Sequence, residues 1–452
     1  MATSTQVLAE LENLEGRTRL LPRRDWIVLY GCVGLLLFAP LAFGAVETWS
    51  GFVMEAGAAG LLAVWLWPGL VGSGFVGSDL AVRWNPLFAP MLAFAALVAL
   101  QLMTGMTSYW YATWTSMLLF SSFGILCFLL TQVLRRPEEL SRLSLVMSLF
   151  GFAVAFFAVI QDLSSNGRIY WLRLPRSGGW IYGPYVNHNH YAGLMEMLFP
   201  IPLAMCLSRK VERGTKIALG VAAVFMASTI VLSGSRGGVV ALAVQLALAA
   251  AYVAIPRKSP RVAMVLGAAL ALGALWTLMV GGSSVADRLS TFHTEAHTEL
   301  SGGLRLTVTK DCLRMLKDRP LFGWGLGTFP TAYPPYQSFY SNIFVNEAHN
   351  DYMQFLVEMG LPGLAVMVWF VVVLFRGAWR KLKGGKLGVN GCLALAGWLG
   401  CVGILVHSFF DFNLQVAANA AWFYTLAAMV TAPAVSEPKA RVMSGSRREV
   451  RL

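Results

Sequence analysis

Apolar runs of about 20 residues recur along almost the whole chain, and a helix of that length spans the hydrocarbon core of a bilayer. Backbone polar groups in lipid must be satisfied internally, so helices are the expected spanning form. Only 13% of the residues are charged and 57% are hydrophobic. We therefore expect an all-α, polytopic integral membrane protein of about 12 transmembrane helices, the number of long apolar runs. The predicted spans are residues 26–44, 51–73, 86–104, 110–132, 142–161, 189–207, 216–233, 238–255, 262–281, 350–375, 391–412 and 416–432.

The distribution of basic residues predicts how these helices are oriented. The chain contains 35 Lys and Arg and has a formal net charge of +12. All but ten of the basic residues fall in the two terminal segments or in alternate loops, which the positive-inside rule assigns to the cytoplasm. We expect a cytoplasmic segment 1–25, a membrane domain 26–432 with one long external loop 282–349, and a disordered cytoplasmic tail 433–452. The positive charge thus reflects topology, and no nucleic-acid partner is expected.

The ten remaining basic residues lie on the predicted outer face, where the topology rule does not require them. For any one residue, a solvated loop charge or a lipid-headgroup contact is a sufficient explanation. Together they would provide a set of donors suited to phosphate. They are Arg168, Arg173, Arg176, Arg236, Arg288, Arg305, Lys310, Arg314, Lys317 and Arg319.

The stretch SGSRGG, 233–238, places an arginine between two predicted spans with almost no loop. An arginine at such a boundary is costly unless it is paired, faces a cavity or reaches lipid phosphate. The glycines would also expose backbone N–H groups to phosphate oxygens. We interpret Arg236 as part of an anion site, with snorkelling to headgroups as the alternative.

A second polar stretch, GPYVNHNHYAGLMEMLFP at 183–200, precedes and enters the sixth predicted span. Helix capping by Asn187 and its neighbours accounts for much of it. Capping leaves Glu196 unexplained, because this acid falls inside the span. His188 and His190 lack a metal-binding pattern, and we expect neither a metal nor another cofactor.

The long loop contains a predicted amphipathic helix that begins after Ser301 and stops at Pro320. Leu304, Val308, Cys312 and Met315 share one face, and Lys310, Arg314 and Lys317 another. The following GWGLGTF is Gly-rich but lacks a P-loop pattern, so we expect a tight turn that presses the loop onto the membrane domain.

The stretch NEAHNDYMQFLVEMGLPGL, 346–364, places a histidine at the start of the tenth predicted span. His349 suits proton transfer near neutral pH, and Glu347 or Asp351 would orient it. A helix-capping cluster is the alternative interpretation. Near the C-terminus, HSFFDFNLQ places His407 and Asp411 on one helix face at the same outer boundary.

These residues together resemble the O-antigen ligase and polymerase-like superfamily of membrane glycosyltransferases. The ligase motif of that superfamily is His, then Asn, Ser or Gln, then nine residues, then Gly-x-x-Gly, Thr or Tyr. His349, Asn350, Gly360 and Gly363 match every position. The SGSRGG turn, the RPLFGWGLGTF stretch at 319–329 and HSFFDFNLQ are also typical, so the resemblance extends from about residue 180 to 430.

The resemblance implies a GT-C-like, metal-independent, inverting glycosyltransferase of the bacterial inner membrane. Its donor would be a glycan on undecaprenyl pyrophosphate, used on the periplasmic face in surface polysaccharide or lipopolysaccharide synthesis. By motif, Arg236 corresponds to an essential arginine of the superfamily, and by context Arg305 does. These two would bind pyrophosphate while His349 activates or holds the acceptor hydroxyl. The residues expected to bind substrate are Asn350, Arg314, Lys317, Arg176, Asn187, His190, Glu196, His407 and Asp411.

The acceptor stays open at this point: a lipid A core sugar, a growing chain or a protein side chain would make the protein a ligase, a polymerase or a protein O-oligosaccharyltransferase. A non-enzymatic lipid-linked-glycan flippase or transporter would also have about twelve spans. Transporters, however, place polar groups near the midplane in two matched halves. Here the polar stretches gather at one face, which favours the enzyme.

Overall fold

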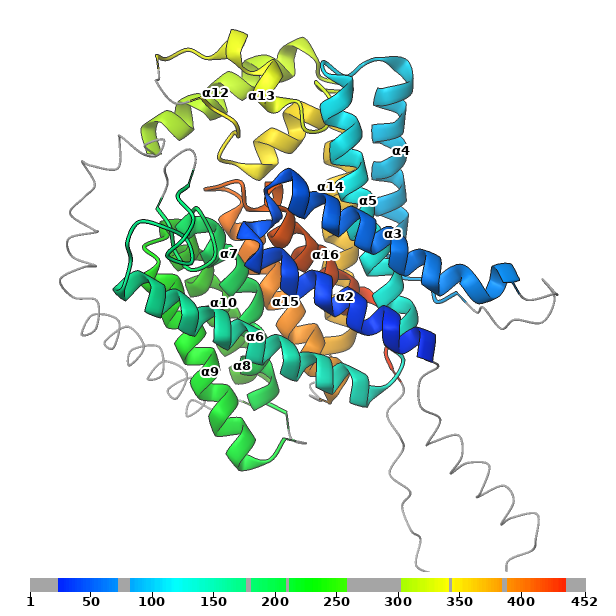
Figure 1. The fold of residues 1–452 in the computed structure, drawn as a ribbon, viewed down its shortest axis with the longest axis vertical. Helices are drawn as coiled ribbons and strands as arrows, with labels where there is room; N and C mark the ends of the chain where they lie inside the picture. The colour runs from blue at the N-terminus through cyan, green and yellow to red at the C-terminus, as the bar shows by residue number, and fades with distance from the viewer. Residues whose placement is uncertain are drawn as a thin grey trace, which may run out of the picture.

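The chain folds into helices joined by short connections, and isolated bridges are the only β-pairing in the part described. The computed structural model describes residues 23–71, 82–175, 180–208, 211–257, 302–340, 344–383 and 388–435. The predicted all-α class is confirmed (Figure 1). The helices are α2 (Arg23–Leu41), α3 (Thr48–Val71), α4 (Phe88–Thr104), α5 (Trp110–Val133), α6 (Pro137–Leu163), α7 (His188–Leu198), α8 (Pro200–Cys206), α9 (Arg213–Leu232), α10 (Arg236–Arg257), α12 (Gly302–Asp318), α13 (Phe329–Ala332), α14 (Asp351–Leu382), α15 (Val389–His407) and α16 (Ala417–Thr431).

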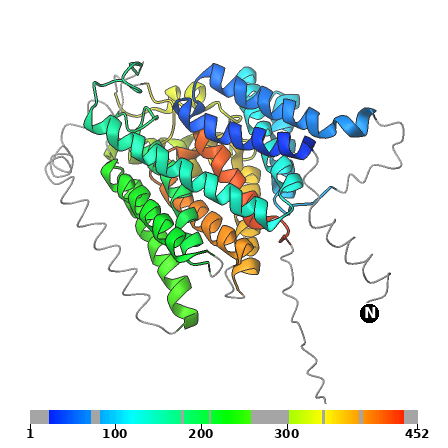
Figure 2. The same ribbon diagram turned by 60° about the horizontal axis from the view of Figure 1, so that its bottom comes forward.

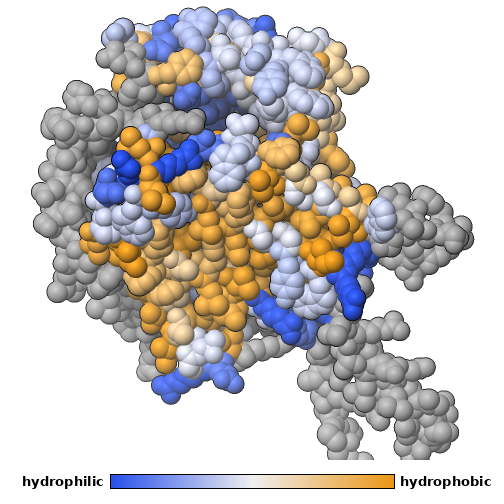
Figure 3. Space-filling view, in the orientation of Figure 1, coloured by the Kyte–Doolittle hydropathy of each residue, from blue (hydrophilic) through white to orange (hydrophobic). Residues whose placement is uncertain are grey.

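Eight of the described helices are long and apolar enough to cross a membrane: α2, α3, α5, α6, α9, α10, α14 and α15. Figure 3 shows apolar residues over the middle of one face, with hydrophilic residues at its upper end and lower edge. The polytopic membrane class follows from this pattern. The other predicted spans correspond to the shorter helices α4, α7 with α8, and α16, while span 262–281 lies outside the described residues.

The core of the bundle is formed by α7, α15 and α16, whose residues are mostly buried. The other long helices surround them (Figures 1 and 2). Small residues on α15 allow close packing, as is common between membrane helices. A Cβ at Gly400 would lie 3.0 Å from the carbonyl oxygen of Met197, and one at Gly403 would lie 2.3 Å from Nε2 of Gln245.

The sixth predicted span, 189–207, is two helices rather than one. α7 ends at Leu198 and α8 begins at Pro200. Proline has no N–H to donate to the carbonyl four residues earlier, so a helix bends or breaks there. That carbonyl belongs to Glu196, and it accepts a hydrogen bond of 2.8 Å from Nε2 of Gln245 on α10 instead. The break thus ties α7 to α10 beside a buried acid.

The predicted amphipathic helix of the long loop is α12, and its bounds agree with the prediction. Val308, Cys312 and Met315 are buried, and Leu304 packs against them. Lys310, Arg314 and Lys317 are exposed on the other side. With α13 and the segment leading to α14, α12 forms a second, smaller core over one end of the bundle (Figure 1).

Candidate active site

The SGSRGG turn is the start of α10, and Ser235 caps that helix. The Oγ atom of Ser235 accepts a hydrogen bond of 3.1 Å from the backbone N–H of Gly238. Such a bond satisfies one of the four backbone donors that a helix leaves unpaired at its N-terminus. Arg236 is the first residue of α10 and is exposed. The turn therefore presents a guanidinium at a helix N-terminus, where the dipole also favours anions.

A buried relay fixes this turn to the helix core. Nδ1 of His407 lies 2.7 Å from Oε1 of Glu196, and Nε2 lies 3.4 Å from Oγ of Ser235. The imidazole of His407 thus bridges the Glu196 carboxyl and the Ser235 hydroxyl, one on each ring nitrogen. A Cβ at Gly237 would lie 2.6 Å from the His407 ring. Glu196, which capping did not explain, thus positions the helix that begins with Arg236.

His349 lies in the turn before α14 with a φ of 51°, a left-handed conformation that few residues with a side chain adopt. Its Nδ1 atom lies 3.3 Å from Oδ1 of Asp411. A proton on Nδ1 faces this carboxylate acceptor, and in the neutral imidazole that tautomer leaves the lone pair on Nε2. No described residue makes a hydrogen bond to Nε2. This arrangement of acid, imidazole and free Nε2 is the one that general bases use.

The expectation that Glu347 or Asp351 orients His349 was wrong, since both carboxylates are bonded elsewhere. Asp351 accepts from Oγ of Ser408 at 2.8 Å and from the N–H of Leu414 at 3.1 Å. Glu347 accepts from the amide of Gln354. The capping interpretation holds only in part, because the cap of α14 is Asn350, which accepts from the N–H of Met353 at 3.0 Å.

Arg305, near the start of α12, reaches the same aspartate. Its guanidinium donates to the carbonyl oxygen of Phe410 at 2.8 Å and lies 3.8 Å from Oδ2 of Asp411. Burial by itself would raise the pKa of Asp411, but Arg305 and His349 outweigh it and hold the pKa well below its usual range. Asp411 is thus a charged link between an arginine and a histidine.

Residues 407–413, which we name the C-terminal turn, connect these groups. The predicted span 391–412 is too long, because α15 ends at His407. His407 and Asp411 therefore do not share one helix face, contrary to the expectation, and their side chains contact different residues. The ring of Phe412 lies 4.6 Å from that of His190 and 4.8 Å from that of His349, edge-on to both.

The C-terminal turn also contacts His190 and Asn350. Nδ1 of His190 lies 3.4 Å from Oδ1 of Asn413, and Nδ2 of Asn350 donates to the carbonyl of Phe409 at 3.3 Å. The contributions of Ser235, Ser408 and Phe412 were missed. All three lie within the motifs singled out from the sequence, but a motif does not reveal which of its atoms face which partner.

Several predicted residues are not brought to this cluster. Arg314 and Lys317 lie further along α12, and at 1.5 Å per residue Arg314 is about 14 Å from Arg305 along the axis. Arg314 instead bonds Asp311 at 2.7 Å. Asn187 caps α7, and Arg176 lies outside the described residues.

Two other arginines of the predicted outer face make contacts within the fold instead. Arg173 pairs with Glu47 and lies over the ring of Phe43. Arg319 donates to the carbonyl of Met106 at 3.1 Å and lies 4.3 Å from the ring centroid of Trp324. Among the basic residues of the predicted outer face that the structure describes, Arg305 contacts the cluster through Asp411 and Arg236 adjoins it through Ser235. Arg288, like Arg176, lies outside the described residues.

The glycines of the ligase motif have a structural role. Gly360 interrupts α14 with φ 66° and ψ −166°, a region open only to glycine. A Cβ there would lie 2.3 Å from the carbonyl oxygen of Leu321. The N–H of Leu361 donates to the carbonyl of Pro320 at 2.9 Å. The segment from His349 to Gly360 thus connects the histidine to the place where the long loop packs against α14. This packing agrees with the turn expected at GWGLGTF, which was predicted to press the loop onto the membrane domain.

The described residues contain no group of three or more His, Cys, Asp and Glu arranged to hold a metal ion. The cations of the cluster are guanidinium groups. Guanidinium offers planar, paired donors that match phosphate oxygens. The cluster therefore holds guanidinium donors beside a histidine–aspartate pair.

Comparison with known protein families matches part of the chain. Residues 221–368 match the family model described as O-antigen ligase, a minority of the 452 residues. This segment includes Arg236, Arg305 and His349 but neither Glu196 nor the C-terminal turn. No curated protein matches the chain at a significant level. The family match confirms the resemblance to the O-antigen ligase-like superfamily and supports a ligase- or polymerase-like role in polysaccharide biosynthesis at a membrane.

Proposed function

We propose that the protein transfers a glycan from undecaprenyl pyrophosphate to an acceptor hydroxyl on the periplasmic face of the bacterial inner membrane. The observation that carries the proposal is the pairing of Asp411 with both His349 and Arg305. One carboxylate thereby holds a base and a phosphate-binding group side by side. Transfer from a lipid pyrophosphate needs both, because one oxygen loses a proton while another gains negative charge.

In the proposed step, the acceptor hydroxyl gives its proton to Nε2 of His349 as its oxygen attacks the anomeric carbon. The bond from that carbon to the pyrophosphate oxygen breaks, and undecaprenyl pyrophosphate leaves with the electron pair. Attack opposite the leaving group inverts the anomeric configuration. Asp411 stabilises the imidazolium that forms, as in other acid–histidine pairs.

Arg236 and Arg305 are the proposed ligands of the leaving pyrophosphate. Fixed donors aimed at developing charge cost no reorganisation during the reaction. Guanidinium groups supply the positive charge that a divalent ion supplies in other phosphate chemistry, so we expect transfer to be metal-independent. Glu196, His407 and Ser235 act through Arg236, by fixing the helix that begins with it.

The decisive test is transfer from a synthetic undecaprenyl-pyrophosphate glycan by purified protein in EDTA. If Arg236 binds pyrophosphate, Arg236→Lys should be nearly as damaging as Arg236→Ala, since a point charge cannot replace the planar fork. If Arg236 only reaches lipid headgroups, lysine should restore activity, because snorkelling needs only a long basic chain. Loss of activity in EDTA that a divalent ion restores would contradict metal independence. A flippase or transporter would form no covalent product at all.

A deletion strain distinguishes the possible acceptors. A ligase should leave lipid A uncapped while lipid-linked polymer accumulates. A polymerase should leave single repeat units, and a protein transferase should leave unmodified protein. The active-site motif favours the ligase.

The proposed topology predicts that the outer end of the bundle, with α12, is periplasmic. In a cysteine-free background, Lys317→Cys should react with an impermeant maleimide in spheroplasts, and Lys383→Cys should not. Both side chains are exposed. The reverse pattern would place the proposed site in the cytoplasm, where the lipid-linked donor is not used in this scheme.

A further inference from the structure

A cavity of about 330 Å³ lies between α4, α5, α14 and α16. Its volume falls within the usual range for small-molecule sites, about 300–1,000 Å³. None of the residues of the proposed anion site lines it, and its described lining contains no lysine or arginine. It is therefore a separate space, on the side of α14 that faces α4 and α5.

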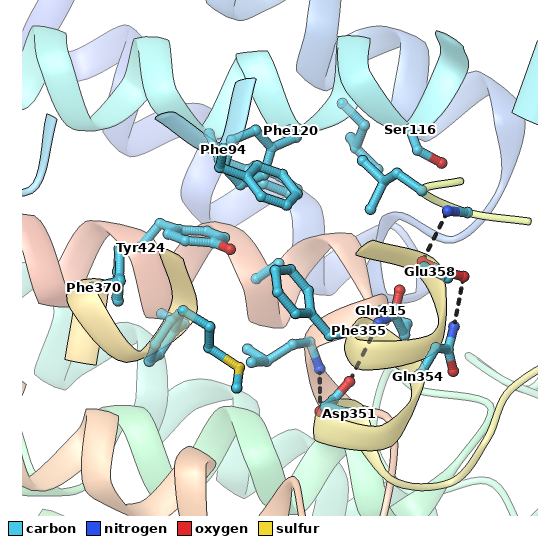
Figure 4. Close-up of a pocket in the computed structure, with 18 of the residues that line it drawn as sticks. Phe94, Ser116, Phe120, Asp351, Gln354, Phe355, Glu358, Phe370, Gln415 and Tyr424 are labelled. Atoms are coloured by element: carbon cyan, nitrogen blue, oxygen red, sulfur yellow. Dashed lines mark hydrogen bonds between the residues drawn. The ribbon is translucent and has the colours of Figure 1, made fainter. Parts of the chain in front are cut away.

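The two ends of the cavity differ in chemistry (Figure 4). Aromatic side chains, among them Phe94, Phe120 and Phe370, line one end. Asp351, Gln354, Glu358 and Gln415 gather at the other. A space with one apolar end and one polar end matches a molecule built the same way, an amphiphile.

The carboxylates at the polar end are already bonded to the protein. Glu358 accepts from the N–H groups of Gly327 at 2.9 Å and Phe329 at 3.1 Å. Asp351 is bonded to Ser408 and to the N–H of Leu414. With their oxygens bonded in this way and no lysine or arginine in the described lining, the carboxylates do not favour a phosphate at this end.

Groups suited to hydroxyls are still available. Glu347 also lines the cavity, and burial raises its pKa to about 8, so near neutral pH this carboxyl is largely protonated and can both donate and accept. The hydroxyl of Tyr424 points into the cavity in Figure 4 and makes no hydrogen bond to a described residue.

We propose that this cavity binds an amphiphile with one apolar chain and an uncharged, hydroxyl-bearing head. The chain lies among the aromatic residues, and the head lies at Glu347, Gln354 and Gln415. Asp351 and Glu347 flank His349 in sequence, so the head reaches the turn that carries the base. If the proposed function holds, this chemistry is that of the acceptor rather than the pyrophosphate donor; the binding itself does not depend on it.

The test uses full-length protein in phosphatidylcholine nanodiscs and three photoreactive probes. Each has the same dodecyl chain with a diazirine at its middle, and the heads are glucose, phosphate and trimethylammonium. The glucoside should label the cavity-lining parts of α14 and α16 about tenfold more than either charged probe, equivalent to 1.4 kcal/mol of binding. Equal or stronger labelling by a charged probe would overturn the proposal.

Matched tryptophan variants locate the site. Val366 lines the cavity, whereas Val368 on the same helix is 52% exposed. Val366→Trp fills the space and should lower glucoside labelling about tenfold, while Val368→Trp should leave it unchanged. Val371→Trp and the exposed Val372→Trp provide a second pair should the first fail to fold. Undiminished labelling in both lining variants would show that the probe binds elsewhere, and the proposal would fail.

Discussion

Two buried aspartates, Asp311 and Asp411, each lie beside an arginine of α12, yet their surroundings differ. Asp311 is 2% exposed and its oxygens are fully engaged. Oδ1 accepts from Arg314 at 2.7 Å and from Oγ of Ser338 at 2.8 Å. Oδ2 accepts from the hydroxyl of Tyr333 at 2.9 Å and the N–H of Ser338 at 3.1 Å.

Asp411 is equally buried, at 1% exposed, but its hydrogen bonds are incomplete. Oδ1 faces His349 and accepts from the N–H of Phe412 at 2.9 Å. Oδ2 has no hydrogen-bond partner among the described residues, and the nearest cation, Arg305, is 3.8 Å away. A carboxylate whose hydrogen bonds are all made stabilises a fold, whereas a buried one with an unmade bond beside a histidine is a candidate for the proposed chemistry.

The largest effect that follows from this difference concerns the histidine. We expect His349→Gln to lower transfer about 10²–10⁴-fold, the range for loss of a general base. Glutamine keeps a polar side chain but cannot take up the proton. The melting temperature in detergent should stay near that of the parent protein. Near-normal transfer would mean that His349 only helps to start α14. Asp411 would then have a structural role, as Asp311 has.

Arg305 and Arg314, the arginines of α12 beside the two aspartates, provide the next comparison. Arg305→Lys should lower transfer about 10²-fold, since removing one donor to developing charge has effects of 10²–10³. Arg314→Lys should change transfer little, because Arg314 serves Asp311. Initial rates with the same donor and acceptor test both variants. Equal losses would mean that the basic face of α12 acts as one donor-binding surface.

Substitutions of the two aspartates should separate an effect on activity from an effect on stability. Asp311→Asn replaces an acceptor with an amide that faces donors, and should lower stability by roughly 1–3 kcal/mol. Asp411→Asn should mainly lower transfer, because a neutral amide cannot stabilise the positive charge that forms on His349 when it takes up the proton. Thermal melting and rates measured on the same preparations test the pair. A larger melting shift for Asp411→Asn would reverse the assignment.

The smallest predicted effect is a pH dependence of stability due to Glu347. Its folded pKa is about 8, above the ordinary value of 4.5, chiefly because of burial. The folded protein keeps the proton between these values while the unfolded chain has lost it, so stability falls as pH rises through this window. The melting temperature should therefore be lower near pH 8 than near pH 5. Glu347→Gln should flatten the change; an identical slope would assign it to another group.

Much of this architecture was predictable because it depends on local pattern. Apolar runs predicted the helices, and the spacing of Val308, Cys312 and Met315 predicted the buried face of α12. Pro200 is the signal that was overlooked in the sixth span, where one proline converts a span into two helices. The residue types of the cluster were also present in the motifs, since chemistry of this kind needs histidine and arginine.

The sequence by itself determined the all-α membrane class, the amphipathic helix of the long loop and the candidate residues Arg236, Arg305 and His349. Only the tertiary structure decided which acid serves which base. Near neighbours in sequence suggested Glu347 or Asp351 for His349, but the partner is Asp411, 62 residues away. These two residues are distant in sequence but close in space, because α15 ends at His407 and the C-terminal turn folds over α14. Side chains there follow the packing of helices, and that packing depends on contacts no single stretch of sequence contains.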